Sequence, residues 1–429
     1  MGNDISVIQD LFPHVDPTLL ELIHLNRLCS PDSVPLPASR RYNRRLRRRR
    51  LQFFKHADEC IRDNTFHRKY RMSFRAFLLL VKTLSPALER DPRKCRYGSP
   101  IFPDLIVAIG IRFMTGVPQG ALADIYRVSQ AEVYKCRDCF IDAVLSNPSL
   151  AIRFPSSHVE WEEVRSGFEE KSYNGLFHGT CGAIDGFFQP TAQPTRKETK
   201  GNVLAYFSGH YKSHGLNCQA ACDIKLRFMY FGVVAPGKTN DCIAYELASD
   251  MKQCIDSLPL GLFFVGDAAY TLSEHLLTPF TGSNREDLNR DAYNFYLSQM
   301  RIRIEMAFGR LTNKFRILRS KLQGTLATNA RVLLCCATLH NFCIDQEELG
   351  SEDDGTAASS SPLEQSNDFV IRAAPDGLAY LPTVDDEDEA AALLRTNLGY
   401  SHAQQSILER INREGTRRPL RNIMRNTIE

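Results

Sequence analysis

Three acidic residues stand out because of their neighbours in the sequence. Asp185 lies near the end of a mostly apolar segment, and Asp267 directly follows the apolar run Phe263–Gly266. A carboxylate in such surroundings is costly unless it is well hydrogen-bonded or holds a cation. Glu305 interrupts a run of arginine and apolar residues, Arg301–Arg310. These three carboxylates are the candidate catalytic and metal-binding residues of the chain.

Three carboxylates on separate segments could hold metal ions for phosphodiester chemistry. Cutting or rejoining a phosphodiester bond calls for two hard cations about 3.5–4 Å apart, one activating the attacking hydroxyl and one stabilising the leaving oxygen. Carboxylate oxygens suit Mg²⁺, which keeps several of its waters. The expected cofactor is therefore a divalent metal, two Mg²⁺ ions or Mn²⁺ in their place. Any one of the three residues alone more often has a structural role, as a strand-end cap or a surface residue of a helix.

The segment around Glu305 is predicted to be a helix from about Met300 to Lys321. Its apolar residues recur at intervals of four and three, which is the buried stripe of a helix: Ile304, Phe308, Leu311, Phe315 and Leu318. Glu305 lies one step around from this stripe, so it should sit at the boundary between core and solvent. Arg301 and Arg310 on the same helix are candidates for holding DNA phosphates beside an acidic site.

The two aspartates should end strands of one sheet. Segments rich in Val, Phe, Tyr, Cys and Ala predict three adjacent strands, the last two joined by a turn at Asp223–Lys225: Phe177–Phe188, Leu216–Ile224 and Leu226–Ala235. A helix over Ile243–Gln253 and a buried strand over Leu262–Gly266 follow. Three strands, a helix, a strand and further helices are typical of an α/β fold of the ribonuclease-H type. This catalytic domain is expected to cover about residues 160–345.

Residues 51–150 are predicted to form a small all-α domain. Two helices joined by a short turn are expected at Gly120–Tyr126 and Ala131–Leu145, the second capped by Ser129. This spacing is typical of a helix-turn-helix, and the second helix carries Lys135 and Arg137, which could meet phosphates or base edges. Any small helical bundle contains such helix pairs, so a purely structural role stays open.

The net charge of +3 hides strong local asymmetry. Eight of the eleven residues from Arg40 to Arg50 are arginine, so residues 1–50 are expected to form a flexible basic arm that binds phosphates or directs nuclear import. A simple solvated leader is the alternative. The DNA-binding candidates in this arm are Arg44, Arg45, Arg47, Arg48, Arg49 and Arg50. Residues 346–429 turn polar, then acidic, then basic, and are expected to be mostly disordered.

The composition is typical of a folded protein of the nucleus or cytoplasm. A chain of 429 residues that is 43% hydrophobic can bury a sizeable core. It lacks an apolar signal core and an apolar run of membrane length, so we expect a nuclear address, with the cytoplasm as a second location, and no membrane association. Its 13 cysteines are expected to be mostly reduced core residues. A structural zinc site at Cys136/Cys139 or at Cys335–Cys343 is the less favoured alternative.

Five motifs resemble those of the Harbinger-type transposases, also called the PIF/Harbinger superfamily, over about residues 175–345. YFSGHYKSHGLNCQ at Tyr206–Gln219 is similar to the family's second-strand region. APGKTND at Ala235–Asp241 looks like its Pro-Gly turn, with Lys238 where serine is more usual. FVGDAAY at Phe264–Tyr270 and RIEMAFGRL at Arg303–Leu311 are similar to its second and third catalytic blocks, and CCATLHNF at Cys335–Phe342 resembles its closing helix.

This resemblance implies that Asp185, Asp267 and Glu305 are the family's DDE triad, which coordinates two Mg²⁺ ions on a ribonuclease-H-like fold. It also implies cutting of double-stranded DNA at terminal inverted repeats, joining to AT-rich targets, a separate Myb-like DNA-binding partner protein and a homo-oligomer. Lys212, in the first motif, is a further DNA-binding candidate. The first catalytic block departs mildly from the family, because Gly186 and two phenylalanines replace its small polar continuation after the aspartate.

Asp241 and His214 match family positions too, as auxiliary candidates. Asp241 could instead cap the helix that follows it, and His214 could contact DNA or only order its strand.

Three functions remain open from the sequence. The first is a DDE transposase or endonuclease that cuts and joins DNA by two-metal phosphodiester hydrolysis and transesterification, and the presence of all three acids in their expected contexts favours it. The second is a domesticated, catalytically silent DNA-binding or chromatin-associated protein derived from a transposase. A generic metal-dependent hydrolase of small phosphates would leave the basic helix and arm unexplained.

Overall fold

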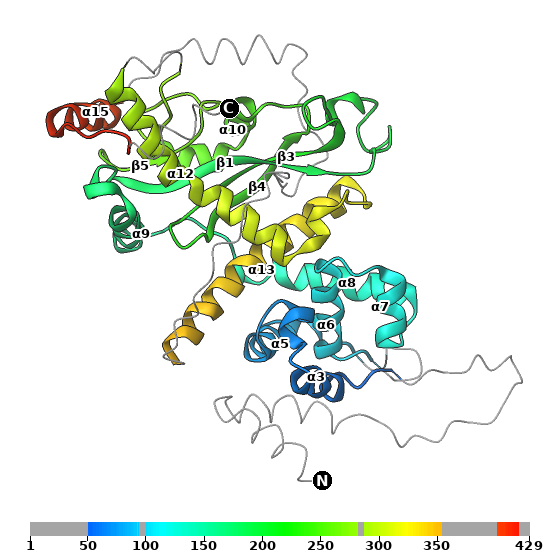
Figure 1. Ribbon diagram of the computed structural model, residues 1–429. Helices are drawn as coiled ribbons and strands as arrows, with labels where there is room; N and C mark the ends of the chain where they lie inside the picture. The colour runs from blue at the N-terminus through cyan, green and yellow to red at the C-terminus, as the bar shows by residue number, and fades with distance from the viewer. Residues whose placement is uncertain (1–49, 92, 94–99, 282–286, 354–400, 420–429) are drawn as a thin grey trace, which may run out of the picture. The chain divides into compact units, whose positions relative to one another are not determined.

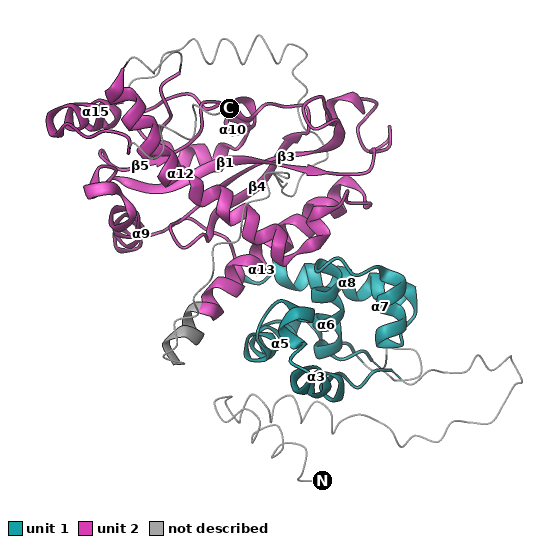
Figure 2. Cartoon of the chain, viewed as in Figure 1, with its two compact units in different colours: residues 1–149 teal, residues 150–429 magenta. Residues whose placement is uncertain are grey.

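A computed structural model of the chain describes residues 50–91, 93, 100–281, 287–353 and 401–419 (Figure 1). The chain divides into two units, residues 1–149 and residues 150–429 (Figure 2). The described part of the first unit is helical, and the second unit is mixed α/β, built around a mixed sheet. Within the described ranges, no helix combines the length and apolar character that a membrane crossing requires.

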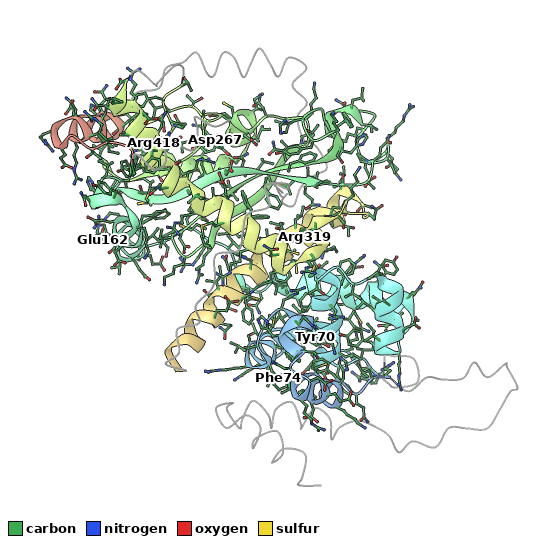
Figure 3. The ribbon with its side chains drawn as sticks, viewed as in Figure 1. Tyr70, Phe74, Glu162, Asp267, Arg319 and Arg418 are labelled. Atoms are coloured by element: carbon green, nitrogen blue, oxygen red, sulfur yellow. The ribbon has the colours of Figure 1, made fainter. Side chains whose placement is uncertain are left out.

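The first unit packs its helices around a cluster of aromatic rings. Its α-helices are α3 (Phe53–Arg62), α4 (Phe66–Tyr70), α5 (Phe74–Leu88), α6 (Pro103–Met114), α7 (Gln119–Tyr126) and α8 (Gln130–Leu145). Tyr70, labelled in Figure 3, is fully buried among these helices and its hydroxyl lies 2.9 Å from that of Tyr126. Gly110 lets α6 approach α8, because a Cβ there would lie 2.2 Å from Cγ of Phe140. The predicted helical character of residues 51–150 is thus confirmed.

The helix pair α7 and α8 is joined by a three-residue turn. Arg127 ends α7 in the left-handed conformation, with φ of 54°. The Ser129 hydroxyl then accepts a hydrogen bond from the Glu132 N–H at 3.2 Å, so the predicted cap of the second helix is confirmed.

The sheet of the second unit contains both parallel and antiparallel strands. The strands are β1 (Thr180–Pro190), β2 (Phe207–Ser208), β3 (Ser213–Cys222), β4 (Phe228–Pro236), β5 (Phe263–Val265) and β6 (Leu276–Leu277). β3 pairs antiparallel with β1 and with β4, whereas β1, β5 and β6 are parallel; the short β2 pairs with the start of β3. The predicted turn between β3 and β4 is present, with the Leu226 N–H donating to the Asp223 carbonyl at 3.2 Å.

Helices cover both faces of this sheet. α9 (His158–Lys171), α10 (Asp241–Leu247) and α11 (Ser249–Asp256) contribute to an apolar cluster that includes Ile184 of β1 and Phe264 of β5. On the other face, Phe187 of β1 and Phe228 of β4 lie 4.7 and 6.0 Å from the ring of Phe308 of α12 (Leu288–Lys314). α13 (Leu326–Asp353) packs on β4, where Asn341 exchanges two hydrogen bonds with the Phe228 backbone.

Two helix predictions had wrong boundaries. The single helix expected over Ile243–Gln253 is broken at Ala248, whose ψ of 57° separates α10 from α11. The helix expected to begin at Met300 begins at Leu288, because Asp287 accepts hydrogen bonds from the Asn289 and Arg290 N–H groups and caps an earlier start. It ends at Lys314, since Phe315 leaves helical geometry, and a 3₁₀ turn (Arg316–Arg319) follows.

The described parts of the C-terminal region are largely helical, within a range that was expected to be mostly disordered. α13 extends to Asp353, and α15 (His402–Glu414) packs on α12. Ser401 caps α15, and Gly415 ends it at φ of 63°. Arg410 of α15 donates to the carbonyls of Asn174 and Gly175, so part of the predicted basic tail is held on the domain by its own contacts. Residues 354–400 and 420–429 and the arm 1–49 lie outside the described residues.

Candidate active site

Asp185 and Asp267 extend from two neighbouring parallel strands. Ala183 of β1 pairs with Val265 of β5, and each aspartate stands two residues beyond its member of this pair. Because side chains alternate along a strand, Asp185 lies on the same face of the sheet as Ala183. The fold therefore places Asp267, just beyond the carboxyl end of β5, beside the strand that carries Asp185 in its middle.

Asp185 is a buried carboxylate within a strand. The residue is 5% exposed, and its Oδ1 accepts a hydrogen bond from the Gly186 N–H at 2.8 Å. The neighbouring Ile184 points into the cluster beneath α10 and α11. By alternation Asp185 faces the opposite side of the sheet, which α12 covers.

Asp267 sits in the turn that follows β5. Its Oδ1 accepts from the Ala269 N–H at 2.8 Å, and its carbonyl accepts from the Tyr270 N–H at 3.3 Å. The residue is partly exposed, and Figure 3 labels it. The turn thus holds the carboxylate by one oxygen at the rim of the strand end.

Glu305 comes from α12, one residue after the fully buried Ile304. Its side chain is 45% exposed, at the boundary between core and solvent as predicted. Nη1 of Arg301, one turn earlier, lies 2.6 Å from Oε1 of Glu305 and 4.0 Å from Oδ2 of Asp185. A single guanidinium therefore lies within ion-pair distance of the carboxylate of β1 and of that of α12.

The oxygen donors at this corner fit a hard divalent ion in chemical type. Carboxylates are the side chains that Mg²⁺ and Mn²⁺ accept, and the contact of Asp185 and Glu305 with the Arg301 guanidinium shows that two of them converge on one positive charge. No group of three or more His, Cys, Asp or Glu side chains in the described part of the chain is already arranged to hold a metal ion. Asp267 is placed by the turn that follows β5.

A polar network that the sequence did not reveal lies beside β3. Asn217 Nδ2 and Gln219 Nε2 donate to Oδ1 of Asp241 at 3.2 and 3.4 Å, and the Tyr270 hydroxyl donates to Oε1 of Gln219 at 2.7 Å. The cap of α10 is Asn240, whose Oδ1 accepts from the Ile243 N–H at 3.0 Å. The alternative of Asp241 as the cap was therefore wrong. The sequence offered one signal for this network: Asn217 and Gln219 stand two positions apart in a predicted strand, so their side chains share one face.

His214 lies at the far end of β3 from this network. Its carbonyl accepts from the Thr191 N–H at 2.9 Å, and its ring meets that of Phe207 edge to face at 5.2 Å. Since the adjacent Gly215 pairs with Pro190, His214 belongs beside the end of β1, several residues beyond Asp185.

The DNA-binding candidates fall in different environments. Lys135 and Lys212 are exposed. Arg137 is only 13% exposed in its side chain, pairs with Asp138 at 2.7 Å and lies over the rings of Phe113 and Tyr134. Arg310 and Lys314 both pair with Glu347. Arg50 donates to the Pro100 carbonyl at 2.7 Å, while Arg44, Arg45, Arg47, Arg48 and Arg49 lie outside the described residues. Contact of these side chains with DNA stays a prediction.

His340 and Cys136, which belong to the two segments considered as zinc sites, are both buried. His340 is 1% exposed, its Nε2 lies 2.8 Å from the Leu226 carbonyl, and burial lowers its pKa to about 3. Burial likewise raises the pKa of Cys136 to about 12, whereas Cys139 is exposed. His340 is therefore neutral at physiological pH and donates its Nε2–H to the backbone.

Comparison with known proteins places this geometry in a family. Residues 184–341 match the family model described as DDE superfamily endonuclease. The chain is 26% identical to the rat protein named "Putative nuclease HARBI1" and 25% identical to its human counterpart, each over 67% of this chain and 78% of the relative. It is also 26% identical to "Protein ALP1-like" of Arabidopsis thaliana, over 78% of this chain and 80% of the relative. No solved structure matches the chain.

These matches confirm the family resemblance predicted from the motifs. The matched segment begins at Ile184, one residue before Asp185, and contains Asp267 and Glu305. Residues 184–341 therefore resemble a DDE superfamily endonuclease domain, and the chain is similar to proteins named as putative nucleases.

Proposed function

We propose that this protein is a DDE endonuclease of the transposase type that cuts and joins double-stranded DNA with the help of divalent metal ions. Asp185, Asp267 and Glu305 are its catalytic residues. One observation carries the proposal: Asp185 of β1 and Glu305 of α12, far apart in the sequence, both lie within ion-pair distance of the Arg301 guanidinium.

The three carboxylates would hold the metal ions. When bound, two Mg²⁺ ions activate the attacking water or hydroxyl and stabilise the leaving oxygen of the phosphodiester. The protein's own contribution is to keep the oxygens in place. The Gly186 N–H holds one oxygen of Asp185 and the Ala269 N–H holds one oxygen of Asp267, so the backbone restricts the orientation of both carboxylates. Glu305 lies on the long helix α12, and the buried side of that helix packs on the sheet.

The sheet supports a ribonuclease-H-like fold for this domain. Three strands that pair antiparallel, β1, β3 and β4, are followed by two short strands parallel to β1, and helices cover both faces. In such an α/β arrangement ligands bind at the carboxyl ends of the parallel strands. Asp267 follows the carboxyl end of β5, and Asp185 lies on the neighbouring strand β1, five residues before that strand ends.

The remaining parts of the proposal concern DNA and location. The pair α7 and α8, with exposed Lys135, acts as a helix-turn-helix-like DNA-binding element, and the arginine-rich arm adds sequence-independent phosphate contacts. The substrate is DNA with terminal inverted repeats, joined to an AT-rich target. The protein works in the nucleus as a homo-oligomer, with a Myb-like DNA-binding partner.

Metal-dependent nicking of labelled duplex DNA tests this proposal. The duplex carries the candidate terminal repeats from beside the coding region, and the protein is incubated with Mg²⁺ or with EDTA. Wild-type protein should nick the duplex only with Mg²⁺, and Asp267→Ala should abolish nicking while its DNA affinity stays within about threefold, because phosphate contacts dominate affinity. Tight binding without cleavage by the wild-type protein would instead identify a domesticated, catalytically silent DNA-binding protein.

A further inference from the structure

We propose that a pocket beside β2 and the start of β3 binds an unpaired nucleotide of the DNA substrate. The proposal rests on the proposed function, since it assumes that the chain acts on DNA. The pocket has a volume of about 890 Å³, within the range of natural ligand sites. It lies between the segment that leaves β1, residues 193–196, and the segment 201–207 that leads into β2.

The walls of this pocket offer apolar and aromatic surface to a base. Leu204 is 77% exposed and Phe207 is 38% exposed, although both are large apolar residues. The His214 ring supports the Phe207 ring edge to face, with their centroids 5.2 Å apart. A nucleobase stacks on an aromatic side chain only when its face is free, which it is in a single strand or after it leaves the duplex. These walls therefore favour an unpaired nucleotide over an intact base pair.

The rim of the pocket is basic and polar. Arg196 and Asn202 line it and are exposed. Lys197 follows Arg196 directly, and Lys212 lies in the turn between β2 and β3; both are exposed. The exposed Arg196 beside an aromatic wall, with two lysines on the adjoining segments, matches a nucleotide, whose phosphate is anionic and whose base is flat and apolar on its faces. A purely apolar peptide would leave these charges without partners.

Hydrogen bonds hold the two pocket segments in place. Glu198 accepts from the Thr195 N–H and the Leu326 N–H, each at 3.0 Å, which ties the first segment to the start of α13. Asn202 Oδ1 accepts from the Ala205 N–H at 3.2 Å, and the Ala205 carbonyl accepts from the Lys238 N–H at 3.0 Å. The pocket is thus built before any ligand arrives, which lowers the entropic cost of binding.

The pocket lies within reach of DNA bound at the candidate active site. Asp185 stands five residues before Pro190, the last residue of β1, and Pro190 pairs with Gly215, the neighbour of His214. Five residues of strand span about 17 Å, which corresponds to roughly five stacked base pairs at about 3.4 Å each. A strand cut at Asp185 could therefore place a nucleotide a few positions away in this pocket.

Binding of single-stranded and duplex DNA to matched variants tests the proposal. The probes are fluorescein-labelled oligothymidylate of about 20 nucleotides and a blunt duplex of equal length. Fluorescence anisotropy is recorded in EDTA at about 0.2 M salt, where phosphate contacts are weakened. The variants are Phe207→Ala, Phe207→Trp and Leu204→Ser. Leu260→Ser is the matched control, because Leu260 is 83% exposed on the same unit and lies outside the pocket.

Phe207→Ala should weaken oligothymidylate binding by about tenfold or more, as expected for loss of one stacked base. Its duplex binding should change by less than about threefold. Leu204→Ser should also weaken oligothymidylate binding. Phe207→Trp, which keeps an aromatic face, should bind oligothymidylate like the wild type, and so should the control Leu260→Ser. Circular dichroism and melting of each variant establish that it is folded.

Two results would overturn the pocket proposal while leaving the proposed function intact. One is unchanged oligothymidylate binding by both Phe207→Ala and Leu204→Ser in a protein that still nicks duplex DNA. The other is an equal loss of single-strand and duplex binding, which would make the pocket a general backbone contact. Failure of the wild-type protein to bind either DNA would overturn the proposed function itself.

Discussion

Nη1 of Arg301, on α12, lies 4.0 Å from Oδ2 of Asp185, on β1. The same atom lies 2.6 Å from Oε1 of Glu305, one helical turn away. Asp185 is almost fully buried, so without a cation nearby its charge would be costly. This ion pair therefore joins the two elements that carry two of the three proposed catalytic residues, and it partly neutralises them.

Arg301→Gln should lower the stability of the metal-free protein and increase its response to Mg²⁺. Removing the guanidinium leaves the buried Asp185 carboxylate without its counter-charge, which should cost about 1 to 2 kcal/mol, less than for a fully buried pair because Glu305 is half exposed. Urea unfolding in EDTA and in Mg²⁺ measures both effects. Arg316→Gln, at an exposed arginine just beyond α12, is the control. Equal Mg²⁺ responses in Arg301→Gln and the wild type would contradict the expectation.

Glu305→Gln should reduce Mg²⁺-dependent nicking by at least about a hundredfold without unfolding the protein. A metal ligand is worth several kcal/mol of transition-state stabilisation, and about 1.4 kcal/mol is a factor of ten in rate. The side chain is 45% exposed, so an isosteric amide should be tolerated structurally. The control is Glu409→Gln on the exposed side of α15. Wild-type nicking by Glu305→Gln would remove Glu305 from the catalytic set.

Tyr270→Phe and Tyr245→Phe should have different effects on stability, although the two rings pack together 5.6 Å apart. The Tyr270 hydroxyl donates to Gln219 Oε1, a fully buried side chain, so its removal leaves a buried acceptor without that bond and should cost about 1 to 3 kcal/mol. The Tyr245 hydroxyl is buried with no hydrogen-bond partner among the described residues. Tyr245→Phe should be neutral or stabilising, and urea unfolding of both variants compares them directly.

Stability should fall below about pH 6.5 through His340. Burial lowers the pKa of this histidine in the folded chain to about 3, from 6.5 in an unfolded one. Between these two values the unfolded chain binds the extra proton. The contribution of His340 is thus complete above pH 6.5 and is lost as the pH falls toward 3, at up to about 1.4 kcal/mol per pH unit.

Urea unfolding at pH 7.5, 6.5 and 5.5 measures this slope, and His340→Gln should flatten it. His178→Gln, at an exposed histidine, should leave the slope unchanged. Burial also raises the pKa of Asp223 to about 6, which acts in the opposite direction, adding stability as the pH falls from 6 to 3.8. Because Asp223 is present in every variant, the difference between wild type and His340→Gln isolates the histidine. Equal slopes in those two proteins would be evidence against this assignment.

Local patterns were sufficient to predict the strands and the helix that carry the three candidate acidic residues. β-rich composition identified the strand around Asp185 and a continuous apolar run identified the strand before Asp267. The periodicity after Met300 placed Glu305 at the edge of a buried stripe. The cap at Ser129 was also readable, because capping is a contact between residues three positions apart. Boundaries were less predictable. The early start of α12 depends on Asp287, and the break at Ala248 depends on how α10 and α11 each pack beneath the sheet.

Motif and composition by themselves indicated the family resemblance, the three candidate acidic residues and the helical character of the first unit, since each is a pattern of neighbouring residues. Only the tertiary structure decided which distant residues those residues contact. Strand pairing brought β5 beside β1, the crossing of α12 over the sheet brought Arg301 to Asp185, and the end of β1 formed a pocket with Phe207 and His214. Such contacts join segments that are distant in the chain, and their geometry is set by packing of the whole domain.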